Sequence, residues 1–186
     1  QKAVASQREG RFADAAQWYG VVLAMHPGHA DILHNRGVCL QSIGRLDEAL
    51  ACYNGALAAR ADFVAALCNR GAVLKDLRRL DDAIACFNRV LALQPDFAAA
   101  LINRAAAMLA LGRFNEALQD SERVLRQHPD LAEALNNRGV ALKQLDRGAE
   151  ALASFDAALA RRNDDAVALE NRGALLADLG RHAEAA

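Results

Sequence analysis

Five asparagines are the residues of this sequence best suited to contact a ligand, because they recur at one fixed spacing. They lie 34 residues apart, and an arginine follows each one: Asn35, Asn69, Asn103, Asn137 and Asn171. An asparagine side chain carries both donors and an acceptor, so it can hold the N–H and C=O groups of an extended backbone whatever its sequence. A fold that aligned the five would form a ladder for another protein's main chain. The alternative is that they serve the fold alone.

The remaining reactive residues do not form a recognisable catalytic or metal site. His26, His29 and His34 straddle Pro27, so they fall on a turn and a helix start and not at i, i+4 on one helix face. The sequence holds no nucleophile elbow, no glycine-rich phosphate loop and no His-Glu-x-x-His motif. We therefore predict a segment that is not an enzyme and that uses no cofactor or metal.

The cysteines and the charge balance argue against several further kinds of site and partner. None of the four cysteines forms a Cys-x-x-Cys pair, so reduced thiols packed as small hydrophobes are expected, as in a cytoplasmic protein: Cys39, Cys52, Cys68 and Cys86. With 22 basic and 23 acidic residues, the net charge of −1 argues against a nucleic-acid or anionic-membrane partner. No apolar run reaches the ~18 residues that a membrane span needs.

The elements that must position the asparagines repeat with the same period. If repeats are numbered from Ala30, Val64, Ala98, Ala132 and Ala166, position 4 is always leucine, position 8 glycine or alanine, position 20 alanine and position 24 mostly aromatic. Positions 4, 8 and 11 share one helix face, and positions 20, 24 and 27 share a face of a second helix. A fixed period in the range of about 20 to 50 residues indicates a solenoid, whose units bury their apolar faces by stacking. The sequence predicts an all-α stack of antiparallel helix pairs.

This pattern resembles the tetratricopeptide repeat (TPR), which has the same residue types at positions 4, 8, 11, 20, 24 and 27 and a proline at 32. The resemblance covers essentially the whole chain and implies a right-handed superhelical solenoid. The expected division is a partial repeat over 1–29, complete repeats over 30–63, 64–97, 98–131 and 132–165, and a truncated repeat over 166–186. Since the chain opens and stops inside repeats, we expect it to be a stretch of a longer array.

Turn and cap residues give two local expectations. Gly44, Gly112 and Gly180 mark the break between the helices of a pair, whereas Arg78 and Asp146 stand at that position and predict two strained turns. The aspartates at position 33 are expected to cap the next first helix: Asp62, Asp96, Asp130 and Asp164.

The resemblance also implies a concave groove lined by the first helix of each pair, at positions 2, 5, 6, 9, 12 and 13. The asparagine ladder resembles that of bacterial-type O-linked N-acetylglucosamine transferases, where such residues grip peptide backbone. Beside the five asparagines, the predicted peptide-binding residues are His34, Gln41, Lys75, Ile102, Leu109, Asn136 and Lys143. Acids outnumber bases five to two in this lining, so a partner with an apolar centre and neutral or basic flanks is expected.

The arginine at position 7 departs from the family's usual leucine in every repeat. Because position 7 lies beside positions 4 and 11, we expect its guanidinium in the seam between helices, near a helix-end carbonyl or the aspartate at position 33. An anion-binding role is the alternative.

Three functions follow from these features. The leading hypothesis is a scaffold that binds an extended segment of a partner protein in its groove. The others are the substrate-recruiting arm of a larger glycosyltransferase and a homo-oligomer formed through open helical ends. The clamp that TPR co-chaperones use for chaperone tails is not expected, because position 5 holds no lysine and position 9 no asparagine.

Overall fold

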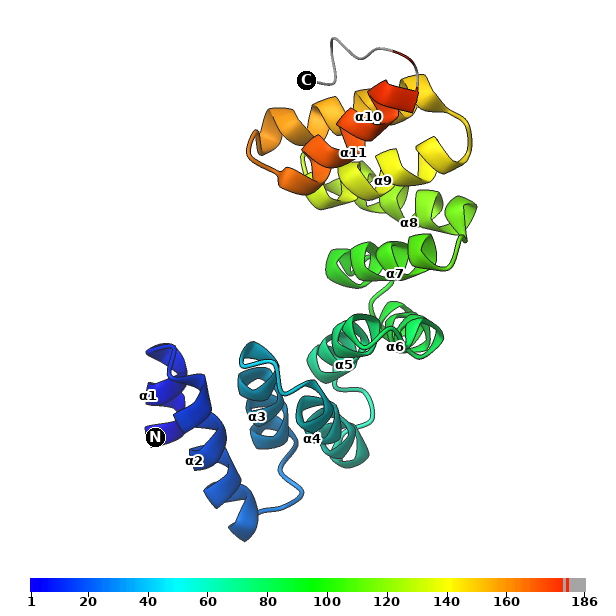
Figure 1. Cartoon of the computed structure of the whole chain (residues 1–186). Coiled ribbons are helices and arrows are strands. Elements are labelled where there is room, and N and C mark those ends of the chain that lie inside the picture. The colour runs from blue at the N-terminus through cyan, green and yellow to red at the C-terminus, as the bar shows by residue number, and fades with distance from the viewer. Residues whose placement is uncertain (179, 181–186) are drawn as a thin grey trace. The chain divides into compact units, whose positions relative to one another are not determined.

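The computed structural model describes residues 1–178 and 180 (Figure 1). This part of the chain forms eleven α-helices and no strand. The helices are α1 (Lys2–Arg8), α2 (Phe12–Met25), α3 (Ala30–Ser42), α4 (Leu46–Ala59), α5 (Val64–Asp76), α6 (Leu80–Leu93), α7 (Ala98–Ala110), α8 (Phe114–Gln127), α9 (Ala132–Gln144), α10 (Gly148–Arg161) and α11 (Ala166–Asp178).

The helices pack in consecutive pairs, which confirms the predicted all-α solenoid class. The first helices α3, α5, α7, α9 and α11 begin at the residues that open the predicted repeats. Contacts divide the chain into an N-terminal half, Gln1–Pro95, and a C-terminal half, Asp96–Ala186. The N-terminal half holds the pairs α1–α2, α3–α4 and α5–α6, and the C-terminal half holds α7–α8, α9–α10 and α11.

A glycine against an aromatic ring sets the close approach within three pairs. A Cβ atom on Gly71 would lie 2.6 Å from Cε1 of Phe87, and one on Gly139 would lie 2.5 Å from Cε1 of Phe155. Gly37 and Tyr53 repeat the arrangement at 2.7 Å. The pair α7–α8 has Ala105 and Ser121 at these positions, both buried. A larger residue at position 8 thus accompanies a smaller one at position 24.

The strained turns are confirmed. Arg78 and Asp146 have φ of 62° and 58°, in the left-handed region where the chain elsewhere uses glycine. A side chain with a Cβ atom adopts this backbone at a cost that glycine avoids.

The expected caps are wrong. The N-cap residues of α5, α7 and α9 are Phe63, Phe97 and Leu131, one position after the aspartates, and their side chains make no cap hydrogen bond. Two of the aspartates pair with arginines instead: Asp96 with Arg123 at 2.9 Å, and Asp130 with Arg161. In α11 a different aspartate, Asp165, accepts hydrogen bonds from the N–H groups of Val167 and Ala168 at 3.1 and 3.2 Å.

Each half has its own core of fully buried side chains. Tyr53, Leu74 and Phe87 lie in that of the N-terminal half, and Leu142 and Phe155 in that of the C-terminal half. Within residues 1–178 and 180, no helix is both long and apolar enough to cross a membrane.

Candidate functional site

The asparagines lie half-buried on the first helices, and three of them reach back to the preceding first helix. The Nδ2 atom of Asn69 is 3.1 Å from Nε2 of His34. Asn137 donates from Nδ2 to the carbonyl of Ile102 at 3.2 Å, and Asn171 donates to Oδ1 of Asn136 at 3.1 Å. Each bond spans 35 residues and joins position 6 of one repeat to position 5 of the repeat before it. These asparagines therefore connect neighbouring first helices.

The other two asparagines bond within their own helix. Asn103 donates to the carbonyl of Ala99 at 2.9 Å, and Oδ1 of Asn35 lies 3.4 Å from Nδ1 of His34.

His34 is held between two of the asparagines. With Asn35 Oδ1 beside its Nδ1 atom and the Asn69 amide beside its Nε2 atom, the ring fits the neutral tautomer that carries its proton on Nδ1. Its centroid is 5.0 Å from that of Phe63 and 5.9 Å from that of Tyr53. Burial lowers the pKa of His34, because the charged imidazolium would lose hydration there.

Gln41 makes a hydrogen bond within the protein. Its Oε1 atom accepts a hydrogen bond from the Tyr53 hydroxyl at 2.8 Å. Burial raises the pKa of Tyr53, with a smaller opposing effect from a hydrogen bond to Asn69. Gln41 therefore helps to fix the Tyr53 ring that packs on Gly37.

Helix α7 carries the apolar part of the predicted lining. Ile102 and Leu109 are half-buried, so both offer surface to a ligand, and Ala106 lies between them on the same helix face. Ala99 and Ala110 are exposed near the two ends of the helix. Part of the predicted site is thus a band of small and apolar side chains.

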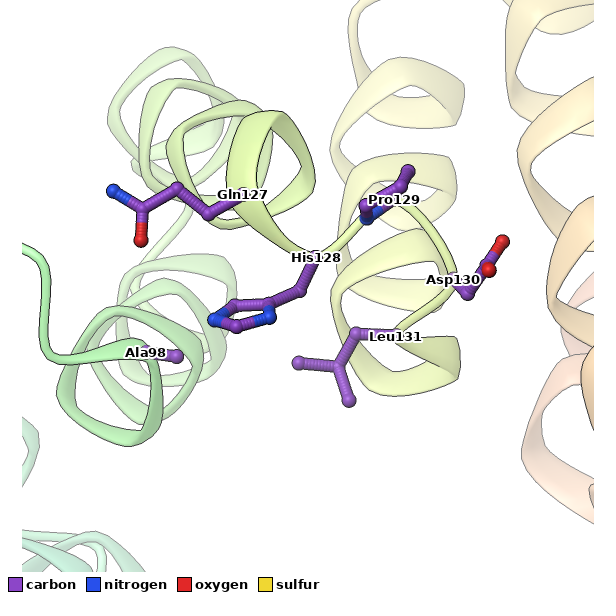
Figure 2. Close-up of a pocket in the computed structure, with 6 residues that line it drawn as sticks. All are labelled: Ala98, Gln127, His128, Pro129, Asp130 and Leu131. Carbon is purple, nitrogen blue, oxygen red and sulfur yellow. The ribbon is translucent and has the colours of Figure 1, made fainter.

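A pocket of about 610 Å³ lies next to this band (Figure 2). Ala98 at the start of α7 forms one wall, and the chain from the end of α8 to the start of α9 forms the other: Gln127, His128, Pro129, Asp130 and Leu131. Figure 2 shows the His128 ring lying toward Ala98. Ala98 is one helical turn before Ile102, so the pocket adjoins the apolar band.

The predicted acidic excess of the lining is largely neutralised within the chain. Asp31 pairs with Arg60 at 2.6 Å, and this hydrogen bond lowers the pKa of Asp31. Glu133 lies 3.9 Å from Arg162. Lys143 pairs with Asp178 at 2.7 Å, and Lys75 is half-buried near the end of α5. Charge alone therefore gives little reason to expect a basic partner.

The position-7 arginines lie between helices, but their partner was not predicted. Arg104 forms a bidentate pair with Asp120, with both N···O distances 2.7 Å. Arg36, Arg70 and Arg138 reach Cys52, Cys86 and Ser154 at 3.9, 3.4 and 3.3 Å. Each of these four partners is 16 residues further on, at position 23 of the repeat on its second helix, whereas Arg172 pairs with Asp156, 16 residues earlier. In the first pair, Lys2 lies 5.0 Å from the Trp18 ring centroid, 16 residues away as well. The constant spacing was the signal that sequence reasoning missed.

The four cysteines are free thiols. Cys39, Cys52 and Cys86 are buried, while Cys68 is half-buried. Burial raises the pKa of each thiol, because the thiolate would be poorly solvated. No group of three or more metal-ligating side chains comes together among the described residues.

Known structures share this fold at low sequence identity. A tetratricopeptide repeat protein from Parabacteroides merdae is 22% identical with a TM-score of 0.87, over 99% of this chain and 73% of that one. A crystal structure of MamA is 20% identical with a TM-score of 0.81, over 89% and 97% of the two chains. YrrB, described as a TPR protein with an unusual peptide-binding site, is 22% identical with a TM-score of 0.73, over 92% and 88%.

Sequence comparison agrees with the structural likeness. No curated protein matches the sequence. Family models described as tetratricopeptide repeat match residues 7–68, 64–97, 107–166 and 137–186. The chain belongs to the tetratricopeptide repeat family.

Proposed function

We propose that this chain is a protein-interaction scaffold that binds an extended segment of a partner protein along its first helices. The observation that carries the proposal is that three of the five asparagines have amides fixed by bonds to the neighbouring first helix. Asn137 and Asn171 each use one N–H group in such a bond. An amide has a second N–H group and a carbonyl oxygen, and these are the groups that pair with a peptide backbone.

Fixing the amide favours binding for a general reason. A side chain already held in one orientation loses less conformational entropy when a ligand binds. The bonds to Ile102 and Asn136 therefore support both hypotheses for the asparagines: they stabilise the stack, and they prepare the amides for a ligand. The two roles are separable by experiment, because only one of them requires a partner.

The partner segment that fits best is apolar and uncharged at its centre. Ile102 and Leu109 offer apolar contact on α7, and the adjoining pocket at Ala98 has room for one side chain. The lining charges at Asp31 and Lys143 are already paired. We therefore expect selection for aliphatic or aromatic side chains instead of basic flanks.

The test is capture of peptides from an array of extended, uncharged 12-residue sequences, with and without apolar residues. The variant carries Asn69→Ala, Asn103→Ala and Asn137→Ala together. The matched control is Asn54→Ala, which removes an exposed asparagine from the second helix α4. Thermal unfolding of each variant sets a temperature at which all remain folded.

We expect the native chain and the Asn54→Ala control to capture peptides. The triple variant should lose this capture at a temperature at which it is still folded. Equal capture by all three would show that the asparagines serve the stack alone. Ala98→Phe should fill the pocket beside α7 and reduce the capture of apolar peptides specifically.

The role as a recruiting arm of a glycosyltransferase rests only on the resemblance of the asparagine ladder. Self-association has an observation of its own: Trp18, Val21 and Met25 on α2 are 41%, 55% and 68% exposed. Neighbouring apolar side chains of this size are a common feature of contact surfaces. Light scattering over a range of concentrations tests the hypothesis, and a Met25→Gln, Val21→Ser variant should remove any association that this face causes.

A further inference from the structure

A second pocket lies in the seam between α8 and α9. It has a volume of about 310 Å³ and is lined by Glu122, Leu125 and Arg126 from α8 and by Arg138 from α9. The residues belong to a second helix and to position 7 of the following first helix, so the pocket is separate from the row of asparagines. Two guanidinium groups at one small pocket are a suitable arrangement for an oxyanion, which arginine binds through paired N–H donors.

Arg138 is less well partnered than its equivalents in the same half of the chain. Arg104 has both oxygens of Asp120 at 2.7 Å, and Arg172 has Asp156 at 2.6 Å. Arg138 instead reaches the Ser154 hydroxyl at 3.3 Å, and its Nε atom is 4.0 Å from Glu122. Its side chain is nevertheless only 30% exposed. Arg138 therefore holds its carboxylate less closely than the other two position-7 arginines of this half do.

Arg126 departs from the chain's own pattern. It stands at repeat position 29, where the corresponding residue of each other repeat that extends this far is alanine: Ala24, Ala58, Ala92 and Ala160. Packing of the helices therefore does not require a long side chain at this position. Arg126 is exposed, and no carboxylate pairs with it among the described residues. The third complete repeat thus adds a cation next to the arginine that lacks a close carboxylate.

The charges around the pocket leave a positive excess. Arg126, Arg138 and Glu122 line it. Glu150 also acts electrostatically on Arg138, but it is held by Arg147 through two hydrogen bonds of 2.8 Å. Three arginines against two glutamates leave a net charge of +1.

We propose that this pocket binds the carboxylate of an acidic side chain from a partner protein. The anion is assigned as a carboxylate because the equivalent arginines, Arg104 and Arg172, hold aspartate carboxylates in this chain. The carboxylate lies between Arg126 and Arg138, and Leu125 contacts its methylene groups. Glu122 opposes binding by charge repulsion and by its attraction to Arg138.

The experiment follows the arginine Nε–H signals of the ¹⁵N-labelled chain by NMR. The probe is the peptide acetyl-Ala-Asp-Asp-Ala-amide, with its Asn-Asn counterpart as the neutral control and inorganic phosphate as the competing anion. Two variants should change the affinity for the peptide in opposite directions. Arg126→Ala restores the alanine of the other repeats, and Glu122→Gln removes the internal negative charge. Circular dichroism verifies that both variants are folded.

We expect the acidic peptide to shift the Arg126 and Arg138 signals saturably and to leave those of Arg104 and Arg172 in place. Arg126→Ala should weaken the affinity by about tenfold, because one charged hydrogen-bonding group is lost, and Glu122→Gln should strengthen it. The asparagine triple variant should bind the peptide as the native chain does.

Three results would overturn the proposal. The first is the absence of saturable shifts, or equal shifts with the neutral peptide. The second is a uniform shift of all arginine signals, which would indicate ionic screening only. The third is tighter binding of phosphate than of the acidic peptide, which would refute the assignment of a carboxylate. None of these outcomes depends on whether the asparagine row binds a peptide.

Discussion

Replacing Gly71 by alanine tests the packing rule on which the helix pairs depend. The new Cβ atom would lie 2.6, 2.8 and 3.1 Å from Cε1, Cζ and Cδ1 of Phe87. Carbon atoms in contact normally lie about 3.5 to 4.0 Å apart, so the ring would have to move by about 1 Å. Phe87 is fully buried, so its ring can move only against the side chains packed around it. Overpacking of this kind costs about 1 to 3 kcal/mol.

Gly20→Ala is the matched control, because Gly20 also lies inside a helix of the N-terminal half. A Cβ atom there would meet nothing closer than Nε of Arg36, at 3.8 Å. Alanine in place of glycine stabilises a helix interior by about 0.5 to 1 kcal/mol, and this gain applies to both variants. The difference in unfolding free energy between the two therefore isolates the clash, at about 1 to 3 kcal/mol.

Chemical and thermal unfolding followed by circular dichroism measures this difference. We expect Gly20→Ala to be more stable than the native chain and Gly71→Ala to be less stable. In a chain that already carries Phe87→Ala, adding Gly71→Ala should no longer lower the unfolding free energy. The Phe87→Ala change is itself destabilising, because it removes the buried ring. If Gly71→Ala were as stable as Gly20→Ala, the close approach of α5 and α6 would not depend on glycine.

Three further outcomes follow from the charges and thiols. Asp120→Ala should destabilise the chain by about 3 kcal/mol in urea unfolding, since it leaves the mostly buried Arg104 without its carboxylate. The control is Asp82→Ala, which breaks an exposed pair with Arg79 and should cost less than about 1 kcal/mol. Because burial lowers the pKa of His34, the unfolded chain binds its proton more readily than the folded chain, so stability should fall as pH drops below the ordinary value of about 6.5 toward the lowered native value. In His34→Gln that part of the pH dependence of the melting temperature should disappear. In native protein treated with a thiol reagent, Cys68 should react before the three buried cysteines, an order that mass spectrometry of peptide digests can establish.

The fold was predictable from the sequence because the period leaves few alternatives. Five leucines at position 4 and alanine at every position 20 fix two helix faces in each repeat. The turns at Arg78 and Asp146 followed from the same alignment, since the chain must reverse there whichever residue is present. The helix caps did not follow, because arginines on the next second helix compete for the aspartates: Asp96 pairs with Arg123 and Asp130 with Arg161.

The candidate site was less predictable, because its contacts depend on distances between helices. The sequence shows that an asparagine recurs, but not that its amide bonds to the residue 35 positions earlier. The prediction for the arginines placed them in the seam but gave the wrong partner: Arg104 meets Asp120 and not an aspartate at position 33. The separation of 16 residues is the same in each repeat, but position 7 is always basic while position 23 changes from repeat to repeat, so the residue types alone did not reveal the contact.

This division between constant and variable positions bears on how a partner would be recognised. A contact that is identical in every repeat can match only a feature that a partner also repeats, and the main chain is the part of a protein that does so. Selection among sequences must then come from positions that differ, such as position 5, which is His34, Cys68, Ile102, Asn136 or Glu170. Position 5 also supplies the group that accepts the bond from the next asparagine in three cases. At Ile102 that group is the backbone carbonyl, so its side chain is free to vary without disturbing Asn137. At His34 and Asn136 the side chain itself is the partner, and a change there alters the ladder as well as the lining.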